Sequence, residues 1–338
     1  MRKINTFIGN IFVFLVSLLV STIILELVLR VSPISDRLGW NGNLSVAYRA
    51  SKLKKDAKVK IVVLGDSFVM WRSGTGVNMF NHVERHFCKR KISIVNLGEG
   101  GSNILNYIAV YENYVNLKPY GIIMCVFLGN DVQPYSGYPN LIFKNEEKGN
   151  IKDFWKRNSV LANASFRLAK KIFPFLHFGV FEHNLRLIQQ DGGFSDFYIQ
   201  ERIKKIDPHI IKLAKADIIN NWMVATGIAL PLCYQYLFSL ESEGSRIAAD
   251  STIRLIGEFY NKIDVKNFLV VLLPESIQVS TRYDDFYKRC GFSLDELPLY
   301  KRRLLTKYMG KRLNEMGIMN IDATDALEKE PSNTYIYI

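Results

Sequence analysis

Cysteine is scarce in this chain of 338 residues, and the few cysteines are widely spaced. Four are present, none in a Cys-x-x-Cys pair: Cys88, Cys125, Cys233 and Cys290. This spacing matches no usual zinc-binding pattern and gives no indication of a disulfide framework. Cys125 lies within an apolar, strand-like run, so we expect a buried free thiol at that position.

The chain also lacks a dense tract of lysine and arginine and the aromatic motif of RNA-recognition domains, although its formal net charge is +12. Nucleic acid is therefore not expected as a partner. Neither the Lys-Ser/Thr of a phosphate-binding P-loop nor the glycine fingerprint of dinucleotide-binding domains is present. The remaining composition, with 48% hydrophobic and 22% charged residues, predicts a globular domain.

A long uncharged run lies near the N-terminus, where residues 4–25 contain no charged side chain. As a helix, about 22 residues reach roughly 33 Å, which is enough to cross a bilayer. The run is longer than the apolar part of a signal peptide and has no small-residue cleavage site. We therefore expect residues 1–31 to be a retained, single-pass transmembrane anchor. Arg2 and Lys3 favour an extracytoplasmic position for the rest of the chain.

The rest of the chain alternates between two kinds of pattern. Residues 32–58 are polar and broken by proline and glycine, which predicts a linker. From residue 59 to 338, short runs rich in β-branched residues alternate with helical periodicity, which predicts an α/β domain with a parallel sheet. Residues 132–251 lack strand rhythm, and we interpret them as a large, mainly helical insertion. We expect strands at 60–65, 92–97, 121–128, 267–273 and from 319, and helices at 79–89, 103–117, 252–262 and 299–316.

Three short motifs follow the first three expected strands. They are Gly65-Asp66-Ser67, Asn96-Leu97-Gly98-Glu99-Gly100-Gly101 and Gly129-Asn130-Asp131. Taken singly, each has the composition of a common turn or helix cap. Open parallel sheets bind ligands at the carboxyl ends of their strands, so together the three motifs indicate a functional site at that edge.

Acyl transfer is a chemistry that uses such a set of residues. A serine at a sharp strand end exposes its hydroxyl, and hydrogen-bond donors must face the oxyanion that develops when it attacks. A backbone N–H near Gly101 and the side-chain amide of Asn130 could supply these donors, with the Ser67 N–H as a third.

The three motifs together resemble the SGNH/GDSL hydrolase superfamily. Its first, second and third blocks are similar to residues 60–69, 96–102 and 129–131, and Gly74-Thr75-Gly76-Val77 resembles the glycine-rich loop that many members carry. The resemblance implies Ser67 as the nucleophile, with Gly101 and Asn130 in the oxyanion hole. It also implies a flavodoxin-like, three-layer α/β/α sandwich and ester hydrolysis or O-acyl transfer, without a cofactor or a metal. With a membrane anchor, the expected substrate is an ester of a cell-surface polysaccharide or lipid.

The general base is the part of the superfamily pattern that this sequence does not contain. The superfamily places Asp-x-x-His just after its fifth strand, and this histidine deprotonates the serine. Here the last histidine is His209, and residues 321–327 resemble the segment that leads into that motif. Either the chain is truncated and the base lies beyond Ile338, which we favour, or the protein lacks the base. As given, we expect a poor catalyst.

Two other interpretations stay open. A chain with this fold and no base could be a catalytically inactive binding or scaffold protein. The loop at residues 74–76 could instead cradle a phosphate in a nucleotide- or flavin-binding domain. His82 and His86 share a helical face, which can bind metal, but no third ligand stands beside them, so we interpret that face as exposed.

Overall fold

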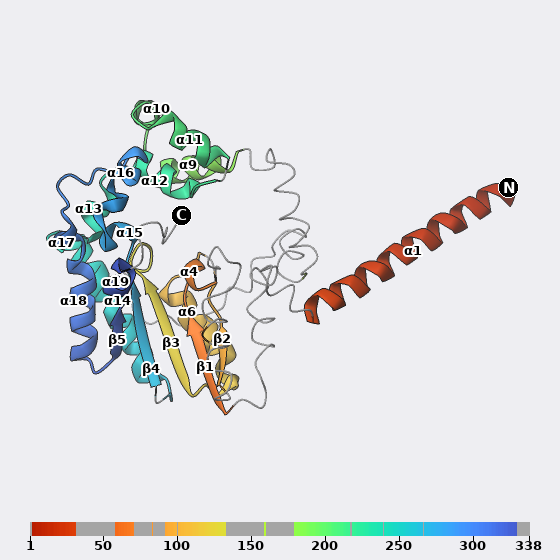
Figure 1. Ribbon diagram of the computed structural model, residues 1–338, viewed down its shortest axis with the longest axis horizontal. Coiled ribbons are helices and arrows are strands. Elements are labelled where there is room, and N and C mark those ends of the chain that lie inside the picture. Colours follow the sequence, from red (N-terminus) through yellow and green to blue (C-terminus); the bar gives the residue numbers. More distant parts are fainter. Residues whose placement is uncertain are drawn as a thin grey trace.

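In the computed structural model, five parallel strands form one sheet in the order β2-β1-β3-β4-β5 (Figure 1). The bounds are β1 (Val59–Leu64), β2 (Ile92–Asn96), β3 (Gly121–Phe127), β4 (Asn267–Leu273) and β5 (Met319–Asp322). These positions agree with the expected strands to within one residue at their starts. The prediction of an α/β fold with a parallel sheet is therefore confirmed. The strand order is that of flavodoxin-like doubly wound sheets.

The structure describes residues 2–31, 58–70, 83, 92–99, 101–132, 159, 179–216, 218–238, 240–265 and 267–329. The linker predicted at 32–58 and the helix predicted at 79–89 fall almost entirely outside these residues, as does the glycine-rich loop at 74–77.

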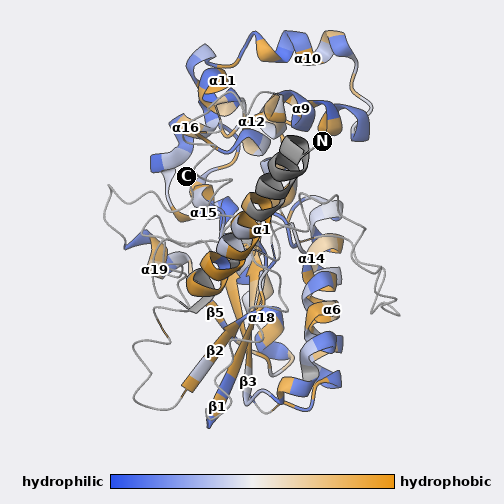
Figure 2. Ribbon diagram, turned by 90° about the vertical axis from the view of Figure 1, so that its right-hand side faces the viewer, coloured by the Kyte–Doolittle hydropathy of each residue, from blue (hydrophilic) through white to orange (hydrophobic). Residues whose placement is uncertain are grey.

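One face of the sheet packs against a layer of three helices, α6 (Ile104–Tyr114), α14 (Glu243–Lys262) and α18 (Leu304–Glu315). Alternate strand residues such as Val62, Ile122 and Val270 are buried in this layer. Figure 2 shows the strands as largely hydrophobic and α6 and α14 as mixed in hydropathy, which is typical of helices with one buried face. This layer holds the main hydrophobic core.

The opposite face of the sheet has little described cover. Its buried residues form a small cluster of Val63, Val69 and Cys125. Val69 belongs to the short helix α4 (Ser67–Met70), and Cys125 is a buried free thiol, as expected. The described residues thus show one helical layer on the sheet, and the second layer of an α/β/α sandwich is not among them.

A group of helices lies beyond the carboxyl ends of the strands (Figure 1). It comprises α9 (Val180–Asp191), α10 (Asp196–Ile203), α11 (Pro208–Lys215), α12 (Asn221–Ala229) and α13 (Cys233–Phe238). The described part of the expected insertion is therefore helical. However, α14 begins at Glu243 instead of 252, because Ser242 caps it by accepting a hydrogen bond from the Ser245 N–H at 3.1 Å.

The segment between β4 and α18 is more irregular than the sequence indicates. It contains α15 (Ser276–Val279), the 3-10 turn η5 (Thr281–Tyr283), α16 (Asp284–Arg289) and α17 (Leu299–Arg302). The single helix expected at 299–316 is divided at Arg303, between α17 and α18.

The N-terminal segment forms one helix, α1 (Arg2–Val31), which projects away from the sheet (Figure 1). Its described side chains, at 14–28, are exposed except for the half-buried Glu26. The carboxylate of Glu26 accepts a hydrogen bond from Ser159 Oγ at 2.9 Å. Among the described residues, no helix is both long and apolar enough to span a bilayer. The transmembrane anchor expected at 1–31 is therefore not supported.

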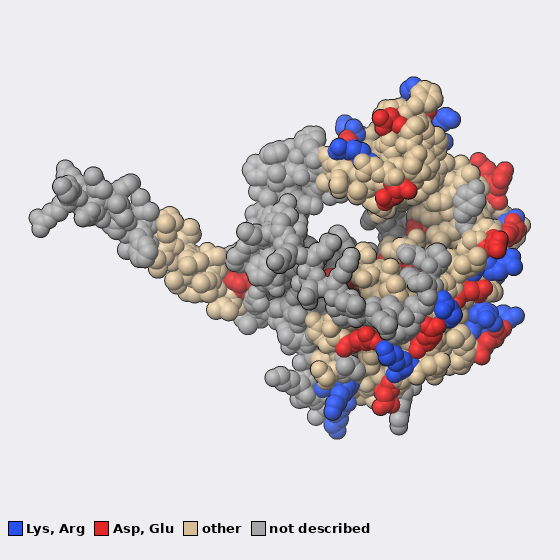
Figure 3. Space-filling view, turned by 180° about the vertical axis from the view of Figure 1, so that it is seen from behind, with Lys and Arg blue, Asp and Glu red and all other residues tan. Residues whose placement is uncertain are grey.

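Acidic and basic side chains are intermixed over the face of the molecule shown in Figure 3. Elsewhere in the described residues, partly exposed ion pairs join Lys262 to Glu112 at 2.8 Å and Lys301 to Glu241 at 3.1 Å. Over the described part of that face, the positive charge is not gathered into a basic patch.

Candidate active site

The carboxyl ends of β1 and β3 lie side by side at the point where the strand order reverses. The chain runs from β1 to β2 on one side and then returns to β3 on the other side. Open α/β sheets bind ligands at such a switch point. Asp66 and Ser67 follow β1, and Asn130 follows β3, so the first and third motifs meet there.

A hydrogen bond joins these two motifs directly. Asn130 Nδ2 donates to Asp66 Oδ2 at 3.1 Å, across 64 residues of sequence. The other oxygen of Asp66 accepts from the Phe68 N–H at 2.9 Å and so fixes the first turn of α4. Because Asp66 is fully buried, this carboxyl orients both the Asn130 amide and the helix that begins at Ser67.

Ser67 is the first residue of α4, and its side chain lies outside the described part of the structure. The glycines on either side of this helix are required by packing. A Cβ atom on Gly65 or on Gly98 would lie 2.2 Å or 2.6 Å from a methyl carbon of Val69. Asn96 completes the contact, since its Nδ2 donates to the Val69 carbonyl at 2.6 Å. The second motif is thereby braced on the helix that carries Ser67.

Gly101 adopts the left-handed conformation, with φ of 77°, and no atom lies within 4 Å of the place of a Cβ. Glycine adopts this conformation at little cost, whereas other residues are strained in it. Gly101 is exposed and lines the cavity described next.

A cavity of about 1130 Å³ lies above the carboxyl ends of the strands. Gly101 and Asn130 line it from the sheet, together with Phe68 and Gly129, and residues of α10 and α12–α14 line it from the other side. Two of the three predicted site residues therefore share one cavity, and the third is the neighbour of Phe68.

Glu275 is a cavity residue that the sequence reading missed. It follows β4, is 8% exposed, and accepts a hydrogen bond from the Tyr287 hydroxyl, which in turn lies 2.7 Å from Ser276 Oγ. A Cβ on Gly129 would lie 2.6 Å from its carboxylate, so glycine allows the carboxylate to approach the third motif. An acidic residue two positions after a buried strand is the signal that could have found it.

Burial changes the acidity of these carboxyl groups. It raises the pKa of Asp66 to about 6, against the opposing effect of its hydrogen bonds to Phe68 and Asn130. It also raises the pKa of Glu275 to about 7, with a further contribution from the charge of Asp66. Strongly shifted carboxyls beside a cavity are typical of functional sites.

Asp131, the last residue of the third motif, has a structural role. It is fully buried, and its Oδ2 accepts from the Tyr107 hydroxyl and from the Phe127 N–H, each at 2.8 Å. Burial raises the pKa of Asp131 well above its ordinary value. This carboxyl therefore fastens α6 to the end of β3.

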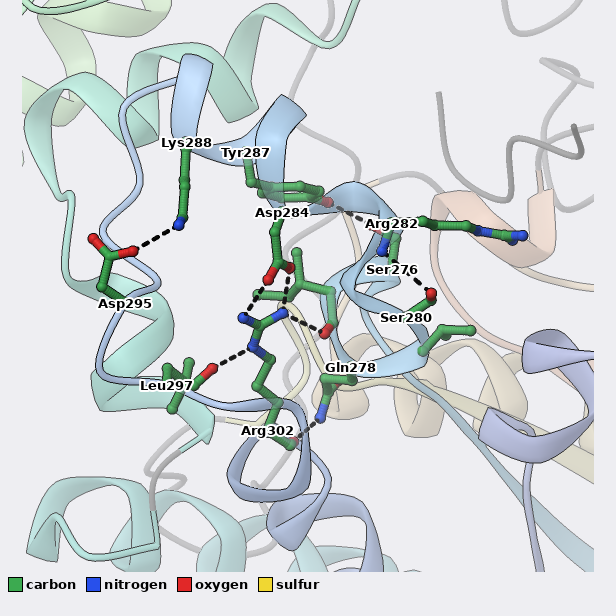
Figure 4. A network of polar contacts seen from close by, with 12 residues as sticks. Ser276, Gln278, Ser280, Arg282, Asp284, Tyr287, Lys288, Asp295, Leu297 and Arg302 are labelled. Atoms are coloured by element: carbon green, nitrogen blue, oxygen red, sulfur yellow. Dashed lines mark hydrogen bonds and ion pairs between the residues drawn. The ribbon is translucent and has the colours of Figure 1, made fainter. Parts of the chain in front are cut away.

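A buried arginine organises the segment that carries Tyr287 (Figure 4). Arg302 is 2% exposed and donates to the Leu297 carbonyl at 2.6 Å, to the Ile277 carbonyl at 3.1 Å and to the carboxylate of Asp284. Its own carbonyl accepts from Gln278 Nε2 at 2.8 Å, and Gln278 Oε1 accepts from the Glu275 N–H at 2.8 Å. The network therefore fixes the backbone of Glu275.

No histidine is placed at the cavity among the described residues. His183 and His209 are exposed and do not line it. The other three histidines, including the His82–His86 pair, fall outside the residues that the structure describes. Within its described parts, the chain has no cluster of His, Cys, Asp and Glu that could hold a metal ion.

Comparison with known proteins gives no relative: no family model, no curated protein and no solved structure matches this chain. The fold and the site therefore define an α/β protein with a parallel sheet and a cavity at its switch point. The resemblance to SGNH/GDSL hydrolases rests on the three motifs themselves.

Proposed function

We propose that this protein is a serine esterase or O-acyltransferase of the SGNH/GDSL type, acting at the carboxyl edge of the sheet. The observation that carries the proposal is the Asn130–Asp66 hydrogen bond, which places the proposed oxyanion donor against the residue that precedes Ser67. Gly101, the other proposed donor, lines the same cavity. Acyl transfer uses a nucleophile and oxyanion donors around one substrate-binding space.

In the proposed reaction, Ser67 Oγ attacks the ester carbonyl and its proton passes to a base. The oxyanion of the tetrahedral intermediate accepts hydrogen bonds from the Gly101 N–H and the Asn130 amide. The alcohol leaves with a proton, and water or a second alcohol then takes the acyl group from Ser67. Asp66 acts through Asn130 as a positioning residue: an amide nitrogen carries two hydrogens, so the bond to Asp66 orients the amide without exhausting it as a donor.

Hydrolysis of an activated aryl ester by the purified chain tests this proposal. We expect slow turnover, because no described histidine lines the cavity, and we expect Ser67→Ala to reduce it to background. Asn130→Ala should lower kcat by about 10²–10³-fold, as for other oxyanion donors. Asn267→Ala is the matched control, since this exposed asparagine begins β4 at the opposite end of the sheet. Turnover that is equal in wild type and Ser67→Ala would contradict the proposal.

A non-catalytic binding or scaffold protein is the second candidate. It is favoured by the absence of histidine from the described lining of the cavity. This candidate predicts a ligand that binds equally well before and after Ser67→Ala, with no turnover in either protein. A phosphate-binding function has less support, because no lysine or arginine is among the described residues that line the cavity.

Membrane attachment, an extracytoplasmic site and a cell-surface polysaccharide or lipid substrate stay predictions. Apart from Glu26, the described side chains of α1, at 14–28, are exposed and mainly apolar, which favours contact with an apolar phase. Alkaline carbonate extraction of membranes from cells that express the chain tests the attachment. Retention in the membrane pellet is expected, and complete release into the supernatant would contradict it.

A further inference from the structure

The wall of the cavity that faces the strand ends comes from the helices between β3 and β4. Large apolar side chains are exposed on it, namely Trp222 at 47%, Leu230 at 38% and Leu232 at 38%. Exposed side chains of this size in a hollow are costly in water and indicate a ligand that covers them.

Four polar side chains of this wall form hydrogen bonds within their own helices or helix caps. Asn220 caps α12 by accepting from the Met223 N–H at 3.1 Å, and Thr226 Oγ1 donates to the Trp222 carbonyl at 2.9 Å. Ser242 accepts from the Ser245 N–H at 3.1 Å and donates to Ser245 Oγ at 2.6 Å. Four polar residues thus serve local structure, and the wall offers a ligand mainly apolar surface.

Charged side chains are also distributed unequally over the cavity lining. Among the described lining residues the acidic side chain is Glu275, at the strand ends, and no lysine or arginine is present. The strand ends therefore carry the polar groups Asn130 and Glu275, and the helical wall carries the apolar ones. The volume of about 1130 Å³ is slightly above the roughly 300–1,000 Å³ of common small-ligand pockets.

We propose that this cavity binds an uncharged ester by its aliphatic acyl chain, with the chain along the helical wall and the carbonyl at the strand ends. Trp222, Leu230 and Leu232 are the specificity-determining residues. A sugar in the same place would need many hydrogen-bond partners, whereas the leucines have none and the capping residues bond to their own helices. A phosphorylated ligand would need cations that the described lining lacks. The position of the carbonyl rests on the proposed function, whereas the binding of the chain does not.

The test uses methyl ketones with pentyl, heptyl and nonyl chains, which are uncharged and have no leaving group. Their binding to the purified full chain is measured by titration calorimetry. Each added methylene is expected to tighten binding by roughly fourfold while the chain remains on the wall. Ser67→Ala should bind the series as the wild type does, because no nucleophile is required.

Leu230→Gln is the variant that probes the wall, and Leu187→Gln is its matched control. Leu187 is 36% exposed on α9 and does not line the cavity. Leu230→Gln should weaken the nonyl ketone by about tenfold or more and flatten the dependence on chain length, while Leu187→Gln leaves both unchanged. Circular dichroism confirms folding of each variant, and Gly244→Trp provides a second obstruction, since a Cβ there meets no atom within 4 Å.

The outcomes separate this inference from the proposed function. Binding that does not depend on chain length, or that Leu230→Gln and Gly244→Trp leave unchanged in folded protein, overturns the inference. Tighter binding of an oligosaccharide than of the nonyl ketone overturns it as well. Chain-length-dependent binding without hydrolysis that requires Ser67 supports the inference and contradicts the esterase proposal. Ser67-dependent hydrolysis without a preference for longer acyl chains supports the esterase proposal and contradicts the inference.

Discussion

At the scale of single residues, the feature that dominates the site is the burial of carboxyl groups at the ends of three neighbouring strands. Asp66, Asp131 and Glu275 follow β1, β3 and β4, and the charge of Asp66 raises the pKa of both others. Each group is held by hydrogen bonds from neighbours distant in sequence, such as Asn130 for Asp66 and Tyr287 for Glu275. Their burial at the strand ends distinguishes them from ordinary surface acids.

These shifts predict that stability falls as the pH rises through the neutral range. The folded pKa of Glu275 is about 7 and that of Asp66 about 6, both above their unfolded values. Folding thus favours the neutral carboxyl. The contribution of each neutral carboxyl to the free energy of unfolding is fully present below about pH 4 and is lost as the pH rises towards about 7. The loss is about 3 kcal/mol for each group.

Urea unfolding at about pH 5 and about pH 8 measures this effect. Glu275→Gln keeps an acceptor for Tyr287 but has no charge, so between the two pH values it should lose about 2–3 kcal/mol less in the free energy of unfolding than the wild type. Glu328→Gln is a suitable control, because Arg303 lowers the pKa of this exposed carboxyl. Equal pH dependence in wild type and Glu275→Gln would show that Glu275 is not buried as a neutral acid.

At the scale of secondary-structure elements, the strands were predictable and several of the connections were not. The run at residues 268–273, for example, is apolar throughout and contains two adjacent valines, and this pattern suits a strand buried on both faces. By contrast, the sequence did not reveal α15 and α16. These short helices are held by Arg302, which donates to the Ile277 carbonyl and to Asp284, and by the capping box of α15, rather than by their own periodicity. Glu275 was missed for the same reason, since its partner Tyr287 lies in that segment.

Arg302 is therefore expected to be the key residue of the segment between β4 and α18. Arg302→Met keeps much of the buried volume but removes the donors to the Leu297 and Ile277 carbonyls and to Asp284. We expect a loss of about 2–4 kcal/mol in the free energy of unfolding. The comparison is Arg289→Met, which removes the ion pair between Arg289 and Asp207 at 2.7 Å. Because solvent screens this pair, the loss should be much smaller than for Arg302→Met. Denaturant unfolding that shows equal losses for both variants would refute this assignment.

At the scale of the whole molecule, the helices between β3 and β4 convert an open sheet edge into a cavity. The sequence predicted that three motifs would lie at this edge, because parallel strands share a direction and their carboxyl ends meet. It predicted Gly101 and Asn130 as neighbours of one space, which the structure shows. It could not predict the cavity, because the wall at Trp222 and Leu230 depends on how α12 packs above the sheet, and no local pattern records that packing.

Ser67 as the nucleophile is tested most directly by covalent labelling of the full chain with an alkyl fluorophosphonate, followed by peptide mass spectrometry. One modified residue, Ser67, is expected, with labelling that is slower in Asn130→Ala and absent in Ser67→Ala. Unmodified Ser67 in folded protein that binds the alkyl ketones, or modification at another residue, would contradict the assignment of Ser67 as the nucleophile.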